Sequence, residues 1–156
     1  LLDAFSQCRA GATAVAFRYF NVYGPRQDPS SHYSGVISRF ADALIRGQSP
    51  TIHGDGEQTR DFISVADVAY ANALAATAPE VSSSVFNLCT GKPTSLNVLV
   101  RTMAQELRRE VYPNYGPARE GDIRHSVGNP SRLQREFGFI ANHDLASGLR
   151  ALLSSR

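Results

Sequence analysis

The sequence predicts an α/β fold built on a parallel sheet. Apolar segments with the length of strands alternate along the chain with amphipathic segments of helical period, the order expected when helices connect parallel strands. The 156 residues are 42% hydrophobic and 19% charged, a composition that suits one globular domain with its own core. The sequence contains no internal repeat and no low-complexity segment.

The first elements are a helix end, a strand and a long loop. Residues 1–9 predict the last turns of a helix that ends at Gly11. The apolar segment 13–19 predicts a strand that is buried on both faces. Residues 21–35 combine prolines, glycines and serines, which predicts a long irregular loop, and loops of this length inside a compact domain are usually functional or disordered.

The next part of the chain predicts a helix and two short strands. Residues 35–46 carry apolar side chains at helical spacing, and Gly47 ends the helix. Strands are expected at 51–53 and 62–65, with a turn at 54–60 between them. The second half predicts, in order, an alanine-rich helix at 66–78, a strand at 85–88, a helix from Leu96 to Leu107, an extended segment at 111–127, a helix opened by Asn129 and Pro130, and a final helix at 145–153.

Charge and composition exclude several classes of protein. Sixteen basic and fourteen acidic residues leave a formal charge of +2 that is evenly scattered, so no nucleic-acid partner is expected. No apolar run approaches the ~20 residues of a membrane-spanning helix, so we expect no membrane partner and a cytoplasmic location. Cys8 and Cys89 are far apart and the histidines lack ligand spacing, which predicts buried free thiols and no metal site.

The basic residues are fifteen arginines and Lys92. The excess of arginine over lysine has two possible explanations: a coding bias of the genome, or a protein that binds phosphates through planar guanidinium groups. The chain also opens inside a predicted helix without an initiating methionine, and Met103 is its sole methionine. We therefore expect a piece of a larger protein.

The segment GDGEQTRDF at 54–62 is the first candidate for a site. Gly54, Asp55 and Gly56 predict a tight hairpin, because Asp-Gly tolerates positive φ angles. The alternative is that the loop holds Arg60 at the mouth of the second strand, where it could meet an anion.

Two further segments carry candidate ligand-binding side chains. In REGD, Arg119 suits a phosphate and Asp122 a sugar hydroxyl, although the two could equally form a solvated surface pair. Asn21 and Gln27 follow a strand that looks central, and ligands of open α/β sheets bind beyond the carboxyl ends of the strands. Asn21 could also be a turn residue at the end of that strand.

Four segments, RYFNVYGPRQDP, GDGEQTRDFISVADVA, VFNLCTG and REGDIRHS, taken in this order, resemble the C-terminal half of the extended short-chain dehydrogenase/reductase family. Within it they are most similar to the bacterial and archaeal UDP-sugar 4-epimerases of the UDP-glucose and UDP-N-acetylglucosamine types. The resemblance covers essentially the whole chain and implies the C-terminal strands of a Rossmann-type parallel sheet with a small mixed substrate-binding subdomain. It implies that residues 1–23 and 63–90 belong to the sheet, and 24–62 and 91–156 to the subdomain.

The resemblance also implies a role for each candidate residue. Arg60 and Arg119 would contact the diphosphate of a nucleotide sugar, and Asp122 would accept from the ribose hydroxyls. Asn21 would hold the substrate near the sugar and phosphate, and Gln27 would face the hexose.

Three more positions follow from the resemblance. Phe20 would lie against the nicotinamide of NAD. His53 stands where relatives carry an aromatic residue beside the uracil. Ser126 matches a position where a bulky tyrosine in some relatives narrows the sugar pocket, so the small serine implies room for an N-acetyl group.

In the family, a tyrosine of a Tyr-x-x-x-Lys pair takes the C4 hydroxyl proton while the C4 hydride passes to NAD, and the 4-keto sugar turns over and takes the hydride back. The sequence lacks this pair, since Leu88 stands four residues before Lys92, and it lacks the dinucleotide fingerprint of three spaced glycines. We expect the chain alone to be inactive and NAD to be bound mainly by an absent N-terminal half.

Several alternatives stay open. The parent could be a nucleotide-sugar dehydratase or decarboxylase of the same family, and the chain could be a non-catalytic nucleotide-binding module or a proteolysed or domain-swapped fragment. The full-length protein is expected to be a homodimer. The fragment is expected to self-associate, because half a parallel sheet leaves an uncovered edge and an apolar face.

Overall fold

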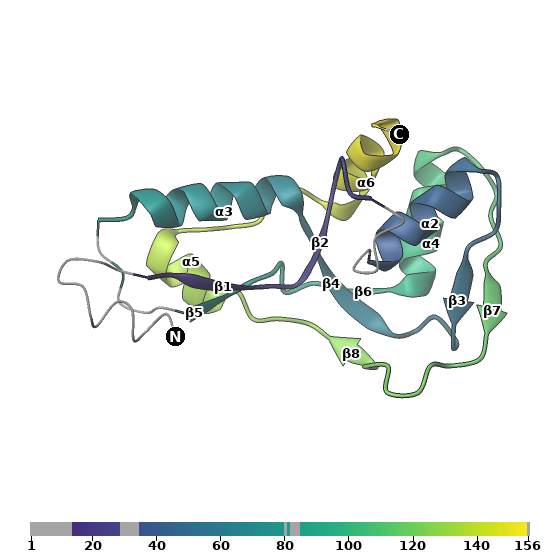
Figure 1. Ribbon diagram of the computed structural model, residues 1–156, viewed down its shortest axis with the longest axis horizontal. Helices are drawn as coiled ribbons and strands as arrows, with labels where there is room; N and C mark the ends of the chain where they lie inside the picture. The colour runs from purple at the N-terminus through teal and green to yellow at the C-terminus, as the bar shows by residue number, and fades with distance from the viewer. Residues whose placement is uncertain (1–13, 29–34, 80, 82–84, 156) are drawn as a thin grey trace.

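A computed structural model describes residues 14–28, 35–79, 81 and 85–155 of the chain. The predicted helix at 1–9, its exit at Gly11 and the thiol of Cys8 lie outside these residues. The described elements form an elongated body (Figure 1), with β1, β5, α3 and α5 at one end and α2, α4, α6, β3 and β7 at the other. The elements, in chain order, are β1 Ala16–Tyr19, β2 Asn21–Tyr23, α2 Val36–Ile45, β3 Thr51–His53, β4 Thr59–Ser64, α3 Val65–Thr77, β5 Val85–Leu88, β6 Pro93–Ser95, α4 Leu96–Glu106, β7 Asn114–Gly116, β8 His125–Ser126, α5 Ser131–Phe137 and α6 Leu145–Ser154.

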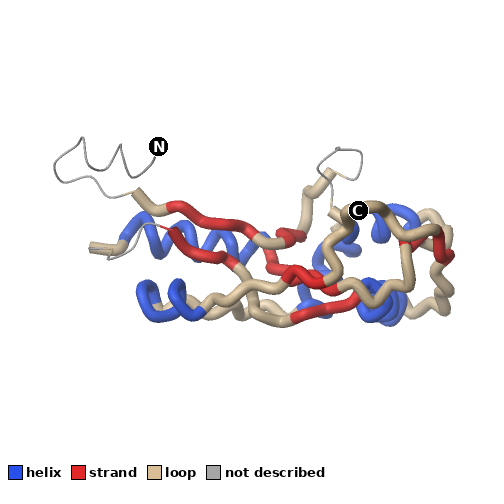
Figure 2. The backbone as a smooth tube through the Cα atoms, turned by 90° about the horizontal axis from the view of Figure 1, so that it is seen from below, coloured by secondary structure: helices blue, strands red, loops and turns tan. Residues whose placement is uncertain are grey.

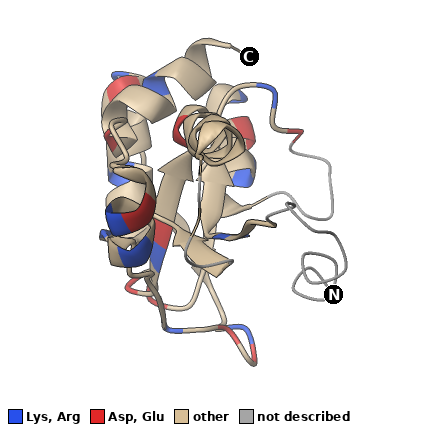
Figure 3. Ribbon diagram, turned by 90° about the vertical axis from the view of Figure 1, so that its left-hand side faces the viewer, with Lys and Arg blue, Asp and Glu red and all other residues tan. Residues whose placement is uncertain are grey.

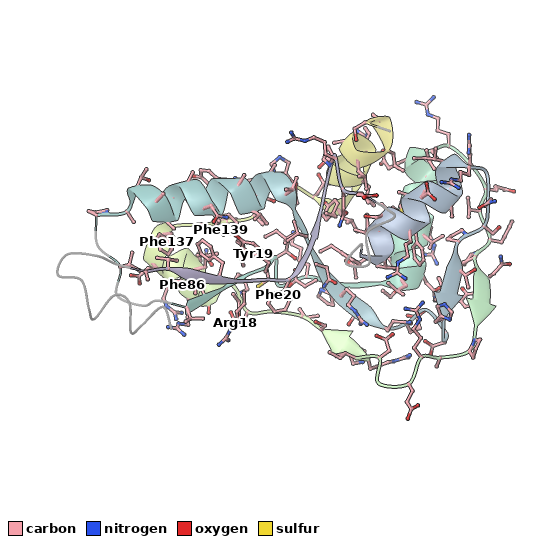
Figure 4. The ribbon with its side chains drawn as sticks, viewed as in Figure 1. Arg18, Tyr19, Phe20, Phe86, Phe137 and Phe139 are labelled. Carbon is pink, nitrogen blue, oxygen red and sulfur yellow. The ribbon has the colours of Figure 1, made fainter. Side chains whose placement is uncertain are left out.

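The parallel pair β1–β5 confirms the predicted parallel α/β arrangement. Its register runs from Ala16 opposite Val85 to Tyr19 opposite Leu88. The ring of Phe86 on β5 is buried and lies 5.2 Å from the ring of Phe137, and Figure 4 shows these aromatic side chains gathered between the strands and α5.

The prediction that the first strand is buried on both faces is wrong. The side of β1 that carries Tyr19 is open, and this tyrosine is 52% exposed. Among the described residues β1 pairs with β5 alone, so its other edge has no strand beside it. An apolar segment indicates that a strand is able to be buried. Whether it is buried depends on the elements that pack against it.

β4 is the strand around which the centre of the molecule is built. It pairs in parallel with β2, in antiparallel with β6, and in parallel with β8. The first of these pairings corrects the prediction of an irregular loop over 21–35 for its first three residues, because Asn21–Tyr23 forms β2 by extending alongside β4. Residues 29–34 of that predicted loop lie outside the described residues. Three-residue strands of this kind depend on their partner more than on their own sequence.

The turn at residues 54–56 has the predicted backbone but not the predicted partners. Gly54 and Gly56 have φ angles of 88° and 78°, the left-handed region that glycine tolerates. The hairpin prediction is nevertheless wrong, because β3 pairs with β7 and β4 pairs with other strands. A side chain at Gly56 would also meet Asn97 of α4, since its Cβ would stand 2.1 Å from Asn97 Oδ1.

The helices agree with the sequence expectations, because local signals determine their ends. α2 buries Ile37, Phe40 and Leu44 and is followed by Gly47 at a φ of 72°. The other main helices begin at side-chain caps: the N-cap oxygens of Ser64, Ser95 and Asp144 accept from main-chain N–H groups of α3, α4 and α6. The positions of α2, α4 and α6 beside one another are visible in Figure 1.

The core consists of two hydrophobic clusters that meet at β4. Phe62 belongs to the cluster that contains Phe40 and Leu99, whereas the next residue, Ile63, belongs to the cluster with Phe86. Successive side chains on a strand point to opposite faces, so one strand serves both clusters. Figure 2, seen from below, shows the strands running between helices at the two ends. The division of the chain into a sheet part and a subdomain stays a prediction.

The surface is mixed in charge. Figure 3 shows acidic and basic residues interspersed over the helices and loops. Within the described part of the chain, no helix has the length and apolar character needed to cross a membrane. The same residues include no cluster of histidine, cysteine and acidic side chains that could hold a metal ion.

Candidate binding cleft

A cleft of about 490 Å³ lies between α2, β3 and the segment before β8. It brings together five residues singled out in the sequence: Asn21, His53, Arg60, Arg119 and Asp122. Arg60 and Arg119, which are far apart in the chain, therefore line one cavity. The shared cleft is the geometry that an anion-binding pair of arginines requires.

The Arg60 side chain is held by three oxygens. Its Nη1 donates to the carbonyl oxygens of Thr59 at 2.8 Å and Ile123 at 2.6 Å. Its Nη2 donates to Asp122 Oδ1 at 2.5 Å, and the side chain is 16% exposed. Arg60 is therefore a fixed guanidinium in the wall of the cleft, with its orientation set by β4 and by the segment before β8.

The REGD segment folds into a turn that presents Asp122. The Asp122 N–H donates to the Arg119 carbonyl at 3.2 Å, and Gly121 adopts a φ of 75°. The aspartate is paired with Arg60 on β4, so the ion pair joins two parts of the chain and is not a local Arg–Asp pair within the turn. The sequence analysis considered only the local pair with Arg119, because the two residues are three positions apart.

A second ion pair fixes the same segment from outside the cleft. Arg124 donates to both carboxylate oxygens of Asp55, at 2.6 and 2.9 Å. This hydrogen bonding, together with the Glu57 N–H, lowers the pKa of Asp55 to about 2. The Arg124 carbonyl also accepts from the Thr59 N–H at 2.9 Å. The glycine turn thus anchors Arg124, a role that the sequence analysis missed.

Asn21 connects the cleft to a neighbouring cavity of about 340 Å³. Its Nδ2 donates to the Asp61 carbonyl at 3.1 Å, which holds the amide at the end of β2. Phe20 and Gln27 line the second cavity, and Gln27 Nε2 donates to the Val22 carbonyl at 3.4 Å. Phe20 and Gln27 therefore line a cavity that adjoins the cleft at Asn21, and the roles that the resemblance implies for these three residues stay predictions.

Asp61 is a buried carboxylate that sequence analysis did not single out. It is fully buried and accepts four hydrogen bonds, from Thr90 N, Thr90 Oγ1, Gly91 N and Gly128 N. These bonds join β4 to the loop after β5 and to the loop after β8. The available signal was an acidic residue directly before the apolar pair Phe62–Ile63 in a predicted strand, because a buried carboxylate is rare unless it has partners.

The far end of the cleft contains His53 and Gln58. His53 Nδ1 lies 3.3 Å from the Pro117 carbonyl, and Gln58 Nε2 donates to the His53 carbonyl at 2.6 Å. The Gln58 side chain is buried, and its Oε1 has no hydrogen-bond partner among the described residues. The imidazole is therefore a wall residue at the end of β3, and its proposed contact with a base stays a prediction.

Arg39 is a third arginine of the cleft and was not among the sequence candidates. It lies on α2, three residues after Val36, which also lines the cleft. The three-residue spacing puts Arg39 on the same face of the helix as Val36, and this spacing was the available signal for Arg39 in the sequence. With Arg60 and Arg119, and with Asp122 as the acidic residue, the lining carries two net positive charges when His53 is neutral.

Ser126 is the candidate that lies outside this lining. It pairs with Arg60 across β4 and β8, but the cleft and the neighbouring cavity are lined by other residues. Its proposed effect on sugar selection stays a prediction. Cys89 is buried as expected, and burial raises the pKa of its thiol to about 12, so it does not provide a thiolate near neutral pH.

Comparison with protein families gives a match to the model of the NAD dependent epimerase/dehydratase family over residues 2–89. The UDP-glucose 4-epimerase of Mycolicibacterium smegmatis is 37% identical over 129 residues, which cover 83% of this chain and 41% of that protein.

Two solved structures are similar over nearly the whole chain. The UDP-N-acetylglucosamine 4-epimerase from Methanobrevibacter ruminantium M1, in complex with UDP-N-acetylmuramic acid, is 39% identical with a TM-score of 0.90 and covers 99% of this chain and 49% of that one. The Thermus thermophilus UDP-glucose 4-epimerase complex with NAD is 31% identical with a TM-score of 0.83, over 99% of this chain and 49% of that one. The chain thus spans about half the length of these proteins.

Proposed function

This chain belongs to the NAD-dependent epimerase/dehydratase family, and from that premise we propose that it is the nucleotide-sugar-binding half of a cytoplasmic UDP-sugar 4-epimerase. The observation that carries the proposal is the cleft in which Arg60, Arg119 and Asp122 converge. A UDP-sugar carries one negative charge on each phosphate, and the cleft lining carries two net positive charges. The match in charge supports a diphosphate ligand.

The cleft residues bind different parts of one ligand. Arg60 and Arg119 hold the diphosphate, and Asp122 accepts hydrogen bonds from the ribose hydroxyls, because an ionised carboxylate is a strong acceptor for a diol. The uracil lies toward His53 at the end of β3. Burial of Arg60 in the wall strengthens its interaction with an anion, since solvent screens a partly buried charge less than an exposed one.

The sugar extends into the cavity beyond Asn21. Asn21 holds the substrate where sugar and phosphate meet, and Gln27 faces the hexose. The resemblance puts a small serine, Ser126, where some relatives carry a bulky tyrosine, and Ser126 narrows neither cavity. We therefore propose that N-acetylated UDP-hexoses are accepted as well as UDP-glucose and UDP-galactose. The similarity to a UDP-N-acetylglucosamine 4-epimerase and to a UDP-glucose 4-epimerase supports both substrate types.

The residues of this chain fit the nicotinamide end of NAD. Phe20 follows β1 and lines the cavity next to Asn21, which suits a flat ring beside the sugar. When bound, NAD would supply reversible hydride transfer at C4 of the sugar. The residues of this chain position the substrate. Arg60 and Arg119 anchor the nucleotide, and these contacts, away from the reacting carbon, keep the ligand bound while the hexose turns. These 156 residues contain neither a Tyr-x-x-x-Lys pair nor the dinucleotide fingerprint, so we expect the chain alone to be inactive.

Calorimetric titration of the chain with UDP tests the binding proposal. We expect micromolar binding, and Arg60→Ala or Arg119→Ala weakens it by about 10- to 100-fold, since hydrogen bonds to charged groups contribute roughly 1.5–3 kcal/mol. Arg46→Ala is the matched control, because Arg46 is an exposed arginine paired with Asp42 at the end of α2. Equal affinity in all four proteins would contradict the proposal.

Product analysis of the full-length parent tests the reaction. UDP-glucose should give UDP-galactose, and UDP-N-acetylglucosamine should give its C4 epimer. A 4-keto-6-deoxy product would instead identify a dehydratase with the same nucleotide site. We propose that the parent is a homodimer, and light scattering during size-exclusion chromatography measures its mass directly.

A further inference from the structure

A pocket of about 350 Å³, which we name the α5–α6 pocket, is lined by Lys92 in the loop after β5 and by Asp144 at the start of α6. It shares no lining residue with the cleft that contains Arg60 and Arg119. Its volume is close to the lower limit of about 300–1,000 Å³ for small-molecule sites. The pocket therefore suits a compact ligand.

The inner wall of the α5–α6 pocket is apolar. Phe62 of β4 and Phe139, which precedes α6, line it and are buried, and Leu145 of α6 is half-buried. Ile140 also lines the pocket and is 58% exposed, so a ligand would cover an apolar side chain that now faces water. Removal of apolar surface from water favours binding. The wall therefore favours a ligand with an aliphatic or aromatic group.

Two opposite charges line the same pocket. Lys92 is exposed, and its ammonium group makes no ion pair or hydrogen bond with the residues that the structure describes. Asp144 is exposed and accepts from the Ser147 N–H at 2.9 Å, which lowers the pKa of Asp144 and keeps it ionised at neutral pH. A carboxylate has about four acceptor positions, so Asp144 has room for a further donor. A cation and an anion thus accompany the apolar wall.

The main chain on both sides of the pocket is fixed by a buried aspartate. Asp61 accepts from the N–H groups of Thr90 and Gly91, directly before the lysine. Asp67 accepts from His143 N at 3.2 Å and from His143 Nδ1 at 2.9 Å, directly before the aspartate that caps α6. Binding would therefore order little more than the lysine side chain, and a preformed site has a lower entropic cost of binding.

We propose that the α5–α6 pocket binds a free apolar α-amino acid in its zwitterionic form. The carboxylate of the ligand pairs with Lys92, its ammonium group donates to Asp144, and its side chain lies against Phe62 and Phe139. An aliphatic carboxylate gains only from the lysine and an aliphatic amine only from the aspartate, whereas a zwitterion gains from both. The inference is independent of the proposed function, because the two sites share no lining residue.

The test is NMR titration of the isotope-labelled chain with L-leucine, which combines an aliphatic side chain with both charges. We expect saturable shifts of the main-chain resonances of Gly91, Lys92 and Asp144. The Kd should be about 1 mM, because both ion pairs are exposed and the ligand is small.

Three related compounds separate the parts of the ligand. 4-Methylpentanoate lacks the ammonium group of leucine, and 3-methylbutylamine lacks its carboxylate. Each should bind about three- to fivefold more weakly than leucine, as expected for the loss of one exposed ion pair. Glycine lacks the side chain and should bind more than about tenfold more weakly.

Variants of the two charged residues assign the contacts. Lys92→Gln should weaken leucine about three- to fivefold and make leucine and 3-methylbutylamine bind equally, because the carboxylate has lost its partner. Asp144→Asn keeps a residue that caps helices, and it should make leucine and 4-methylpentanoate bind equally. Lys92→Arg keeps the charge and should leave the Kd for leucine within about twofold. Asp42→Asn is the matched control, because Asp42 is paired with Arg46 and does not line the pocket.

The loss of selectivity against a single analogue is decisive, because a variant that disturbs the fold weakens all the ligands together. The inference is overturned if leucine at about tenfold the expected Kd gives no saturable shifts, or if leucine and its two singly charged analogues bind the original chain equally. Unchanged leucine affinity in both Lys92→Gln and Asp144→Asn also overturns it. Circular dichroism checks that each variant is folded, and the analogue series on the original chain decides the matter where a variant is not.

Discussion

Replacement of Asp61 by asparagine tests how β4 is held to the loops after β5 and after β8. Asp61 Oδ1 accepts from Thr90 N at 2.8 Å and Thr90 Oγ1 at 2.7 Å, and Oδ2 accepts from Gly91 N at 2.8 Å and Gly128 N at 3.2 Å. The carboxylate is fully buried. Asparagine has almost the same shape, so the change removes charge and one acceptor without creating a cavity.

The magnitude follows from the donors that lose their partner. One oxygen of asparagine can keep two of the four bonds, whereas its NH₂ group faces the other two donors. Hydrogen bonds to a charged group contribute about 1.5–3 kcal/mol each, so the loss of two costs roughly 3–6 kcal/mol. Because small domains are stable by only about 5–15 kcal/mol, this is a large part of the free energy of unfolding.

Urea denaturation at pH 7, followed by circular dichroism, measures the change in the free energy of unfolding. Asp42→Asn is the control, because Asp42 forms a surface i,i+4 pair with Arg46 at 3.2 Å and should change the free energy by less than about 0.5 kcal/mol. A loss below about 1 kcal/mol in Asp61→Asn would refute the reasoning, since a buried carboxylate with four donors must be worth more than an exposed pair.

Three further predictions concern the surroundings of the cleft. The Arg124 hydrogen bonds lower the pKa of Asp55 from 3.8 to about 2, so the stabilisation from this pair is present above about pH 4 and is lost as the pH falls toward 2. NMR titration of the carboxyl carbon measures this pKa. Asp55→Asn should remove this part of the pH dependence of stability. Gly148→Ala places a Cβ 2.3 Å from the Tyr23 hydroxyl oxygen and should lower the free energy of unfolding by about 1–3 kcal/mol through overpacking, seen as a lower Tm. Burial raises the pKa of Cys89 to about 12, so iodoacetamide at pH 8 should modify it only after denaturation, and peptide mass spectrometry locates the label.

The helices could be predicted from the sequence because their determinants are local. The apolar spacing in α2 and the glycine after it predicted both the buried face and the end of the helix. The strand Val85–Leu88 was likewise predicted with its observed bounds. β2 and β6 were missed, and β7 and β8 were predicted only as parts of an extended segment, because such short strands depend on a partner that lies beside them.

The convergence of Arg60 and Arg119 on one site could be predicted from the sequence, but the contacts that hold Arg60 in place could not. Arg60, Arg119 and Asp122 were chosen from residue chemistry and from the family resemblance, and they line one cleft. The pairing of Arg60 with Asp122 and the anchoring of Arg124 by Asp55 could not be predicted, since each joins residues more than 60 positions apart.

The sequence by itself determined the helices, their caps, the positive-φ turn at Gly54 and Gly56 and the chemical types of the ligand-binding side chains, because these depend on neighbours within a few residues. The tertiary structure alone decided that β3 pairs with β7 and that Asp122 faces Arg60. Strand pairing and ion pairing depend on which distant segments the core brings together. The sequence allows several partners for each strand and each charge, and the packing of the core determines which of them meet.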